Sequence, residues 1–239
     1  MSAVFFALIA AAGNLVGGYA VVRHERRSLA LIDLFLAFGA GFMISVALLE
    51  VAPKAISLRS DAPVYIVAGY LAVHLAQHVL VPHFHFGEET HKLSPAQGLS
   101  ALIGLLLHTF FDGVAIASGF LVSGHLGLLL FLAVFLHKLP EGVAMASVML
   151  AGGQSRGRAL SSAALLGIAT VLGVVLTEVS VPLVDHGLAI SAGVTIYVAA
   201  SNLVPELQSR RGWSMPVTFF GGAAAFFLTR LLVEAAGVK

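Results

Sequence analysis

Eight apolar stretches of roughly 20 residues each take up nearly all of the 239-residue chain. Wound as an α-helix, a stretch of this length crosses the roughly 30 Å hydrocarbon core of a bilayer. The stretches are residues 3–22, 30–51, 63–81, 98–121, 126–150, 160–182, 187–207 and 215–236. Backbone groups in lipid must hydrogen-bond within their own segment, so each stretch is expected to be helical. The sequence therefore predicts an all-α polytopic membrane protein with eight transmembrane helices.

The connections between these stretches are too short to hold a separate soluble domain. Only 10% of the residues are Asp, Glu, Lys or Arg, against about 25% in soluble domains. We therefore expect residues 1–239 to form one transmembrane domain whose function lies inside the lipid bilayer, with no nucleic-acid partner. Cysteine is absent, which excludes thiolate metal sites and thiol redox chemistry.

Positive charge is distributed unevenly between the two sides of the membrane. The connections after the first, third, fifth and seventh stretches carry eight Lys and Arg residues, whereas the opposite side, including both termini, carries three. Because Lys and Arg concentrate in cytoplasmic loops, both termini are predicted to lie outside the cytoplasm of a cell (plasma or inner) membrane. The histidine-containing loop at 82–97 is then cytoplasmic.

The most informative motif occurs twice, as HTFFDGVAIAS at residues 108–118 and as HKLPEGVAMAS at residues 137–147. Residues four apart lie on one face of a helix, so His108 pairs with Asp112 and His137 with Glu141. The loop between the two helices is very short, which makes them antiparallel neighbours. The two pairs are therefore predicted to converge at one depth in the membrane.

Imidazole and carboxylate groups together suit Zn²⁺ and other first-row divalent ions. Ionisable groups at the centre of a membrane usually mark an ion or proton pathway. A buried hydrogen-bonded pair that only locks helices together is the structural alternative. Two copies at matched depth favour the ion site, and the adjacent Gly113 and Gly142 permit the close helix approach that it needs.

A second internal echo relates residues 39–53, GAGFMISVALLEVAP, to residues 191–205, SAGVTIYVAASNLVP. The two segments lie in helices predicted to run in opposite directions. Inverted repeats of this kind are typical of transporters that alternate access around a midplane site. We therefore expect a 3+2+3 inverted-repeat bundle with the two motif-bearing helices at its centre.

The doubled motif resembles the signature of the ZIP family of divalent metal-ion transporters, and residues 39–53 and 191–205 resemble the corresponding helices of that family. The resemblance implies a transport site made by His108, Asp112, His137 and Glu141, with Met43 as a further contact. Many relatives hold a second metal beside the first. Here Thr109 replaces an asparagine and Lys138 an acidic residue of that second site, while Glu178 matches a helix-borne glutamate.

A protonated lysine cannot coordinate a metal, and its charge opposes a nearby dication. We therefore hypothesise one transported ion, with the Lys138 ammonium in place of the second metal and paired with Glu178 or Glu141. The alternative for Lys138 is snorkelling to a membrane interface, which its central position disfavours.

Further polar residues mark the ends of the expected pathway. Glu50, late in the stretch 30–51, is a candidate entrance ligand, although a solvated carboxylate at a helix end is equally compatible with its position. His83 and His85 belong to a histidine cluster that is interpreted as a metal exit, with a merely solvated loop as the alternative.

The sequence thus predicts a transporter that imports a divalent metal ion, zinc in the first place, as substrate rather than as cofactor. The rival class is an intramembrane zinc-dependent hydrolase, and it is disfavoured because the chain has no His-Glu-x-x-His motif. Helices with faces of small residues often associate, so a homodimer is expected.

Overall fold

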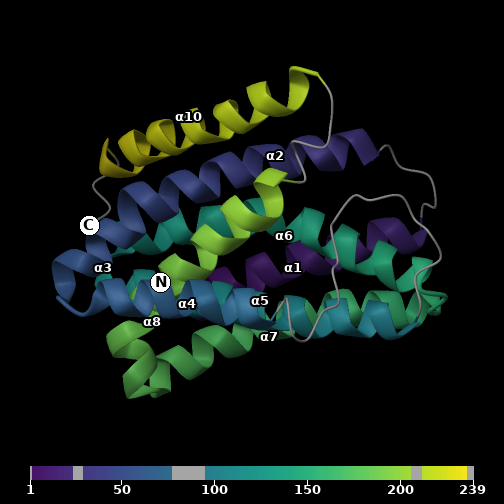
Figure 1. The fold of residues 1–239 in the computed structure, drawn as a ribbon, viewed down its shortest axis with the longest axis horizontal. Helices are drawn as coiled ribbons and strands as arrows, with labels where there is room; N and C mark the ends of the chain where they lie inside the picture. Colours follow the sequence, from purple (N-terminus) through teal and green to yellow (C-terminus); the bar gives the residue numbers. More distant parts are fainter. Residues whose placement is uncertain (1, 24–28, 77–94, 206–211, 236–239) are drawn as a thin grey trace.

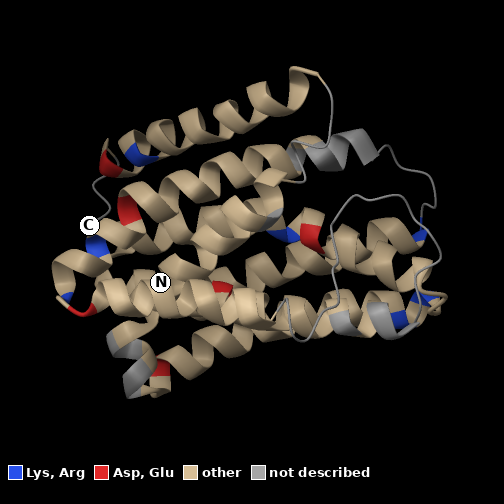
Figure 2. Ribbon diagram, viewed as in Figure 1, with Lys and Arg blue, Asp and Glu red and all other residues tan. Residues whose placement is uncertain are grey.

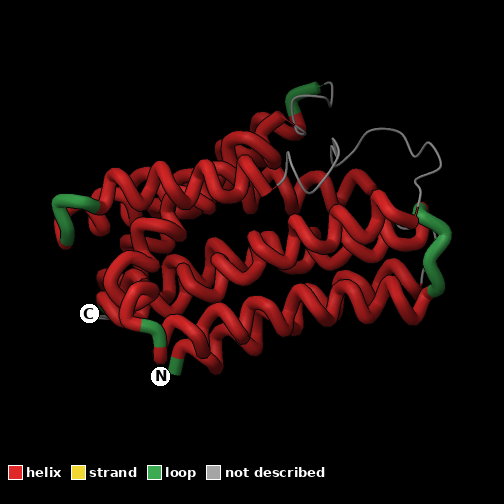
Figure 3. Tube along the Cα trace, turned by 60° about the horizontal axis from the view of Figure 1, so that its bottom comes forward, coloured by secondary structure: helices red, strands yellow, loops and turns green. Residues whose placement is uncertain are grey.

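The computed structural model describes residues 2–23, 29–76, 95–205 and 212–235, and these residues form helices with no strand among them. The helices lie alongside one another in an elongated bundle (Figures 1 and 3). The helices and two π-helical segments (η) are α1 (Ala3–Arg23), α2 (Leu29–Val46), η1 (Ala47–Val51), α3 (Ala52–Leu58), α4 (Ala62–Leu75), α5 (Pro95–Val122), α6 (Gly124–Ala151), α7 (Arg156–Val179), α8 (Val181–Tyr197), η3 (Val198–Leu203) and α10 (Ser214–Ala235).

Six helical runs among the described residues are long and apolar enough to cross a membrane. They comprise α1, the continuous run through α2, η1 and α3, and the helices α5, α6, α7 and α10. The stretches predicted at 63–81 and 187–207 contain shorter apolar helices, Ala62–Leu75 and His186–Ser201. The chain is therefore an all-helical polytopic membrane protein, and full spans at these two places stay a prediction.

Predicted connections are partly helical in the structure. The predicted connection between 182 and 187 is helical, because α8 begins at Val181 directly after Ser180, with Pro182 in its first turn. Proline is favoured there, since its missing N–H group has no partner in a first turn anyway. The expected loop at 82–97 also ends early, because α5 already begins at Pro95.

Helices α5 and α6 form a tight antiparallel hairpin. Ser123 alone separates them, and its side chain accepts a hydrogen bond from the backbone N–H of Leu126 at 3.1 Å, which caps the start of α6. This cap satisfies one of the free N–H groups of the first turn. The hairpin fixes the relative height of the two copies of the motif.

Glycines bring α1 and α7 into backbone contact with this hairpin. A Cβ atom built on Gly113 of α5 would lie 2.0 Å from the carbonyl oxygen of Thr170 in α7, and one built on Gly173 would lie 2.1 Å from that of Phe110. On the other side, a Cβ atom built on Gly142 would lie 2.1 Å from the backbone carbonyl oxygen of Asn14 in α1. One built on Gly17 of α1 would lie 2.2 Å from the backbone carbonyl oxygen of Leu139 in α6. Any side chain at these glycines would force the helices apart.

The remaining long helices pair by the same type of contact. Gly41 of α2 and Gly222 of α10 approach the backbone of each other's helix, with built Cβ atoms 1.9 and 2.0 Å from a carbonyl oxygen. Gly193 of α8 and Gly69 of α4 do the same, at 1.9 and 2.2 Å. The helices thus pack as α1 and α7 around the hairpin, with the α2–α10 and α4–α8 pairs beside them.

Helices α2 and α8 each end in a π-helical segment. Segment η1 lies directly before Ala52 and Pro53, and η3 directly before Val204 and Pro205. These places correspond to each other in the sequence echo of 39–53 with 191–205. A π-turn widens the helix locally and is frequent at functional sites.

Charged residues lie mostly toward the ends of the bundle, with few along its length (Figure 2). In the connection between α3 and α4, the Arg59 guanidinium donates hydrogen bonds of 3.0 and 3.1 Å to the Asp61 carboxylate. These bonds hold the pKa of Asp61 below its ordinary value. Water does not stabilise charges inside the bundle as it does this pair, so the buried charged residues need partners within the protein.

Candidate metal centre

Four buried side chains from the α5–α6 hairpin meet in the interior of the bundle. They are His108 and Asp112 of α5 and His137 and Glu141 of α6, and one potential ligand atom of each lies within 4.8 Å of the other three. All four are at most 8% exposed. The sequence spacing predicted this set and its convergence, and the structure brings the four side chains together.

One oxygen atom, Oδ2 of Asp112, is the hub of the cluster. The Nε2 atoms of His108 and His137 lie 3.4 and 3.2 Å from it, and the Nζ atom of Lys138 lies 2.7 Å from it. Three nitrogen atoms from two helices therefore surround a single carboxylate oxygen. Such a buried carboxylate is stabilised only while cations or N–H donors face it.

The backbone orients His137. Its Nδ1 atom lies 2.9 Å from the carbonyl oxygen of Ala133, one turn earlier in α6. A carbonyl oxygen can only accept, so Nδ1 carries the proton and donates it to Ala133, and Nε2 is the ring nitrogen directed at Asp112. A metal-binding histidine is usually held in this way, by a backbone carbonyl on its second nitrogen.

Lys138 and Thr109 complete the polar interior. The Lys138 ammonium donates hydrogen bonds of 2.7 Å to Asp112 and 2.6 Å to Glu141, and its side chain is fully buried. The Thr109 hydroxyl donates to the other oxygen of Glu141. The predicted pairing of Lys138 with Glu141 is thus present, the Asp112 contact is additional, and snorkelling to an interface is wrong for Lys138.

The donor set fits a first-row divalent ion. Two imidazole nitrogens and two carboxylate oxygens supply four ligands, the number that Zn²⁺ prefers. Bond lengths of about 2.0–2.2 Å require ligand atoms within roughly 4.4 Å of one another. The observed limit of 4.8 Å means that small side-chain movements close the group around an ion.

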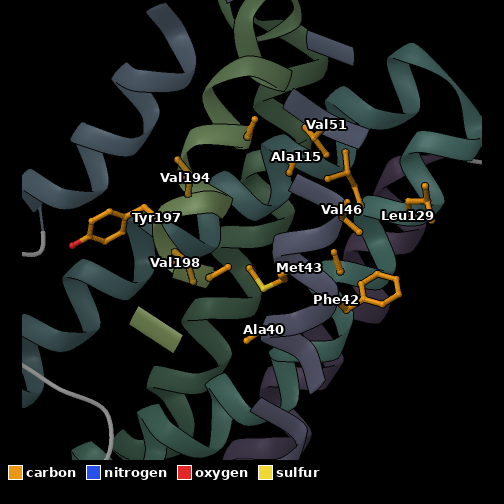
Figure 4. Packing of buried hydrophobic residues seen from close by; sticks show 14 of the residues in the cluster. Ala40, Phe42, Met43, Val46, Val51, Ala115, Leu129, Val194, Tyr197 and Val198 are labelled. Atoms are coloured by element: carbon orange, nitrogen blue, oxygen red, sulfur yellow. The ribbon is translucent and has the colours of Figure 1, made fainter. Parts of the chain in front are cut away.

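Met43 and Glu50 lie on the helix that packs beside this hairpin. Met43 is 1% exposed and lies in an apolar contact region between α2 and α8, near Ala40 and Val198 (Figure 4). It is one turn beyond Gly39, whose built Cβ atom would lie 3.8 Å from Cβ of His137. Glu50 lies farther along, in η1, with its carboxylate 3.5 Å from the Arg230 guanidinium of α10.

Glu178 is not brought to the cluster. It is exposed near the C-terminal end of α7 and is not a partner of Lys138, whose ammonium contacts Asp112 and Glu141. The α7 residue that packs against the motif is Thr170, two turns earlier, whose carbonyl oxygen meets Gly113. Of the two predicted partners of Lys138 the structure shows Glu141, and a metal contact of Glu178 stays a prediction. His83 and His85 lie outside the described residues.

Sequence reasoning overlooked one buried polar residue beside the hairpin. Asn14 of α1 is 0% exposed, and within the described part of the chain neither atom of its side-chain amide has a hydrogen-bond partner. The available signal was a lone asparagine in an otherwise apolar stretch, next to Gly13 and near Gly17 and Gly18.

Fold and cluster together define a class: a polytopic helical membrane protein with a buried histidine–carboxylate group suited to a divalent cation. Residues 85–229 match the family model described as ZIP Zinc transporter. This range is more than half of the chain and includes both copies of the doubled motif. The chain therefore belongs to the ZIP family, as the motif resemblance predicted.

Two bacterial relatives match over nearly the full length. The Zinc transporter ZupT of Escherichia fergusonii is 26% identical over 251 residues, which cover 97% of this chain and 96% of the relative. The Zinc transporter ZupT of Enterobacter sp. strain 638 is 29% identical over 250 residues, which cover 96% of each chain. Membership of a transporter family makes a divalent metal ion the substrate rather than a cofactor, and the intramembrane hydrolase alternative is excluded.

Proposed function

We propose that this protein imports a divalent cation, zinc in the first place, by coordinating it with His108, Asp112, His137 and Glu141. The observation that carries the proposal is the convergence of these four ligand atoms in the interior of the α5–α6 hairpin. Zinc is favoured by the mixed imidazole and carboxylate donors and by the names of both relatives.

The Lys138 ammonium makes this a site for one ion. It lies between the Asp112 and Glu141 carboxylates, where a bridging second dication would have to bind. Thr109 offers a hydroxyl that is already directed at Glu141. A fixed positive charge therefore takes the part that a second metal has in many relatives.

The pathway runs from Glu50, as the entrance ligand, past Met43 to the four-residue site, and leaves by His83 and His85. The Arg230 contact holds Glu50 at the end of α2, where an arriving cation would compete with the guanidinium. The excess of Lys and Arg on one side supports a cytoplasmic loop at 82–97 and termini outside the cytoplasm of the cell membrane.

The bundle is interpreted as a 3+2+3 inverted repeat of eight transmembrane helices within a single domain. Two pairs of contacts support this interpretation. Gly17 of α1 packs against α6 as Gly173 of α7 packs against α5, and the glycine contact between α2 and α10 has its counterpart between α8 and α4. We also propose a homodimer, since α10 exposes the small residues Gly221 and Ala224.

Uptake by reconstituted vesicles tests the transport site. Wild-type protein should accumulate Zn²⁺ with saturable kinetics, and the His108→Ala/His137→Ala variant should not. The matched control is His125→Ala/His186→Ala, the same change at two described histidines outside the cluster. Uptake that survives loss of His108 and His137 would reject the proposed site.

A further inference from the structure

The Lys138 ammonium needs other acceptors whenever an ion occupies the site proposed above. An ammonium group has three N–H donors, and two of them go to Asp112 and Glu141 at 2.7 and 2.6 Å. Both carboxylates become ligands once the metal binds, so they can no longer serve the ammonium in the same way. A fully buried cation without acceptors is strongly destabilised.

Helix α1 covers the face of α6 that carries Lys138. A Cβ atom built on Gly13 would lie 3.1 Å from Cβ of Lys138, and one built on Gly17 would lie 2.9 Å from the backbone nitrogen of Val143. Contacts thus advance in the same direction along both helices, which therefore run parallel. Lys138 and Gly142, four residues apart on α6, both face this contact.

Asn14 lies in the middle of this contact. Its backbone oxygen is 2.1 Å from the built Cβ position of Gly142, which places Asn14 at the level of that glycine. Helical side chains lean toward the N-terminus of their own helix. Since the helices are parallel, the Asn14 amide leans from the level of Gly142 back toward the level of Lys138.

The same amide is buried without a partner. Asn14 is 0% exposed, and neither its Oδ1 nor its Nδ2 atom makes a hydrogen bond to any residue that the structure describes. Such a group costs free energy of folding in the state where it is unpaired, and each one requires an explanation. A state in which the buried Lys138 ammonium has lost its carboxylate acceptors would give the amide oxygen a partner.

We propose that Asn14 is a positioning residue of the transport site, whose amide oxygen accepts a hydrogen bond from the Lys138 ammonium when the metal ion takes Asp112 and Glu141. The residue acts through Lys138 and does not contact the ion. It thereby lowers the cost of displacing the ammonium and strengthens metal binding. This inference rests on the proposed transport site.

The test is Zn²⁺ affinity of the purified full-length chain, measured by competition with a fluorescent chelator. Asn14→Leu should weaken binding by roughly tenfold, the value of one hydrogen bond to a charged group. Asn14→Asp should strengthen it, because a carboxylate attracts the ammonium away from the ligands more than an amide does. A purely structural role for Asn14 predicts weaker binding for both changes.

Combining changes at Asn14 and Lys138 tests whether Asn14 acts through the lysine. In a Lys138→Met background, and in Lys138→Gln as a second neutral replacement, Asn14→Leu should leave the affinity unchanged. Equal weakening with and without the lysine, or no weakening in the wild-type background, would overturn the proposal. The matched control is Thr170→Val on α7, since the Thr170 hydroxyl is already bonded to Leu166 at 3.3 Å and its removal should not change the affinity.

Failure of the transport-site proposal gives a different result. If the His108→Ala/His137→Ala variant binds Zn²⁺ as the wild type does, the site itself is wrong. If that variant loses binding while Asn14 and Lys138 act independently, the site stands and only the role of Asn14 is rejected.

Discussion

The two copies of the doubled motif have the same spacing but different surroundings. In the α6 copy, His137 is oriented by the Ala133 carbonyl, and Lys138 links both carboxylates. In the α5 copy, Nδ1 of His108 is buried and has no hydrogen-bond partner in the described chain. The backbone therefore fixes the ring of His137 before the ion arrives, whereas no such bond holds Nδ1 of His108. A repeated motif need not have repeated roles.

The carboxylates provide the largest expected contrast. Asp112 has three nitrogen atoms within 3.4 Å of one oxygen, whereas Glu141 has the Lys138 ammonium and the Thr109 hydroxyl. Asp112→Asn should lower Zn²⁺ affinity by roughly 100-fold or more, and it should destabilise the fold by about 3 kcal/mol because a buried charge pair is broken. Glu141→Gln should have the smaller effect on both. Chelator competition and thermal unfolding measure the contrast, and equal losses would contradict the role of Asp112 as the hub.

The two copies differ in charge at the residue after the histidine, which is Lys138 in the α6 copy and Thr109 in the α5 copy. Replacing the ammonium with a carboxylate in Lys138→Asp should raise the number of bound Zn²⁺ ions from one to two, because the fixed cation is removed and a ligand is added. The matched change in the other copy, Thr109→Asp, retains the ammonium and should leave one ion. Metal content after equilibrium dialysis is the measurement. An unchanged ratio in Lys138→Asp would show that the lysine does not occupy a second metal position.

The glycines after the carboxylates are expected to behave alike. Built Cβ atoms at Gly113 and Gly142 lie 2.0 and 2.1 Å from carbonyl oxygens of α7 and α1, so Gly113→Ala and Gly142→Ala should each destabilise the fold by about 1–3 kcal/mol. Gly157→Ala is the control, since nothing lies within 4 Å of its built Cβ. Unequal unfolding temperatures for the first two variants would mean that the contact of α5 with α7 and the contact of α6 with α1 are not equally closely packed.

Thr109→Val should have the smallest effect. It removes one hydroxyl that donates to Glu141 while keeping the shape of the side chain, so the expected loss is about 1 kcal/mol, or roughly fivefold in Zn²⁺ affinity. Thr195→Val on α8, outside the cluster, serves as the control. A loss as large as that of Glu141→Gln would mean that Thr109 is itself a ligand.

The parts of the site that follow from local spacing could be predicted from the sequence. The pairing of His108 with Asp112, and of Lys138 with Glu141, needs only the helix period. The Lys138 contact with Asp112 crosses from one helix to the other and depends on the exact height of the hairpin, which the Ser123 cap sets. No pattern within one helix contains that information.

A family resemblance supplies residue type without helix register. It points to Glu178 on α7, whereas the contacts of Gly113 and Gly173 bring Thr170 to the motif. The sequence pattern does not single out Asn14, because an isolated polar residue in an apolar helix has no periodic partner. Six of the helix spans follow from apolar length, but the start of α8 does not, since the apolar stretch 160–182 continues past Val179, where α7 ends, and includes Pro182, which lies in the first turn of α8.

The buried lysine has an electrical consequence for the working cycle. Two carboxylates and one ammonium leave the empty site with one negative charge, and a bound dication changes this to one positive charge. A membrane potential that is negative inside, worth about 2.3 kcal/mol per charge for each 100 mV, therefore drives the loaded site inward and the empty site outward. Uptake should accordingly rise with the imposed potential, and Lys138→Gln, whose loaded site is neutral, should lose the inward part of this drive.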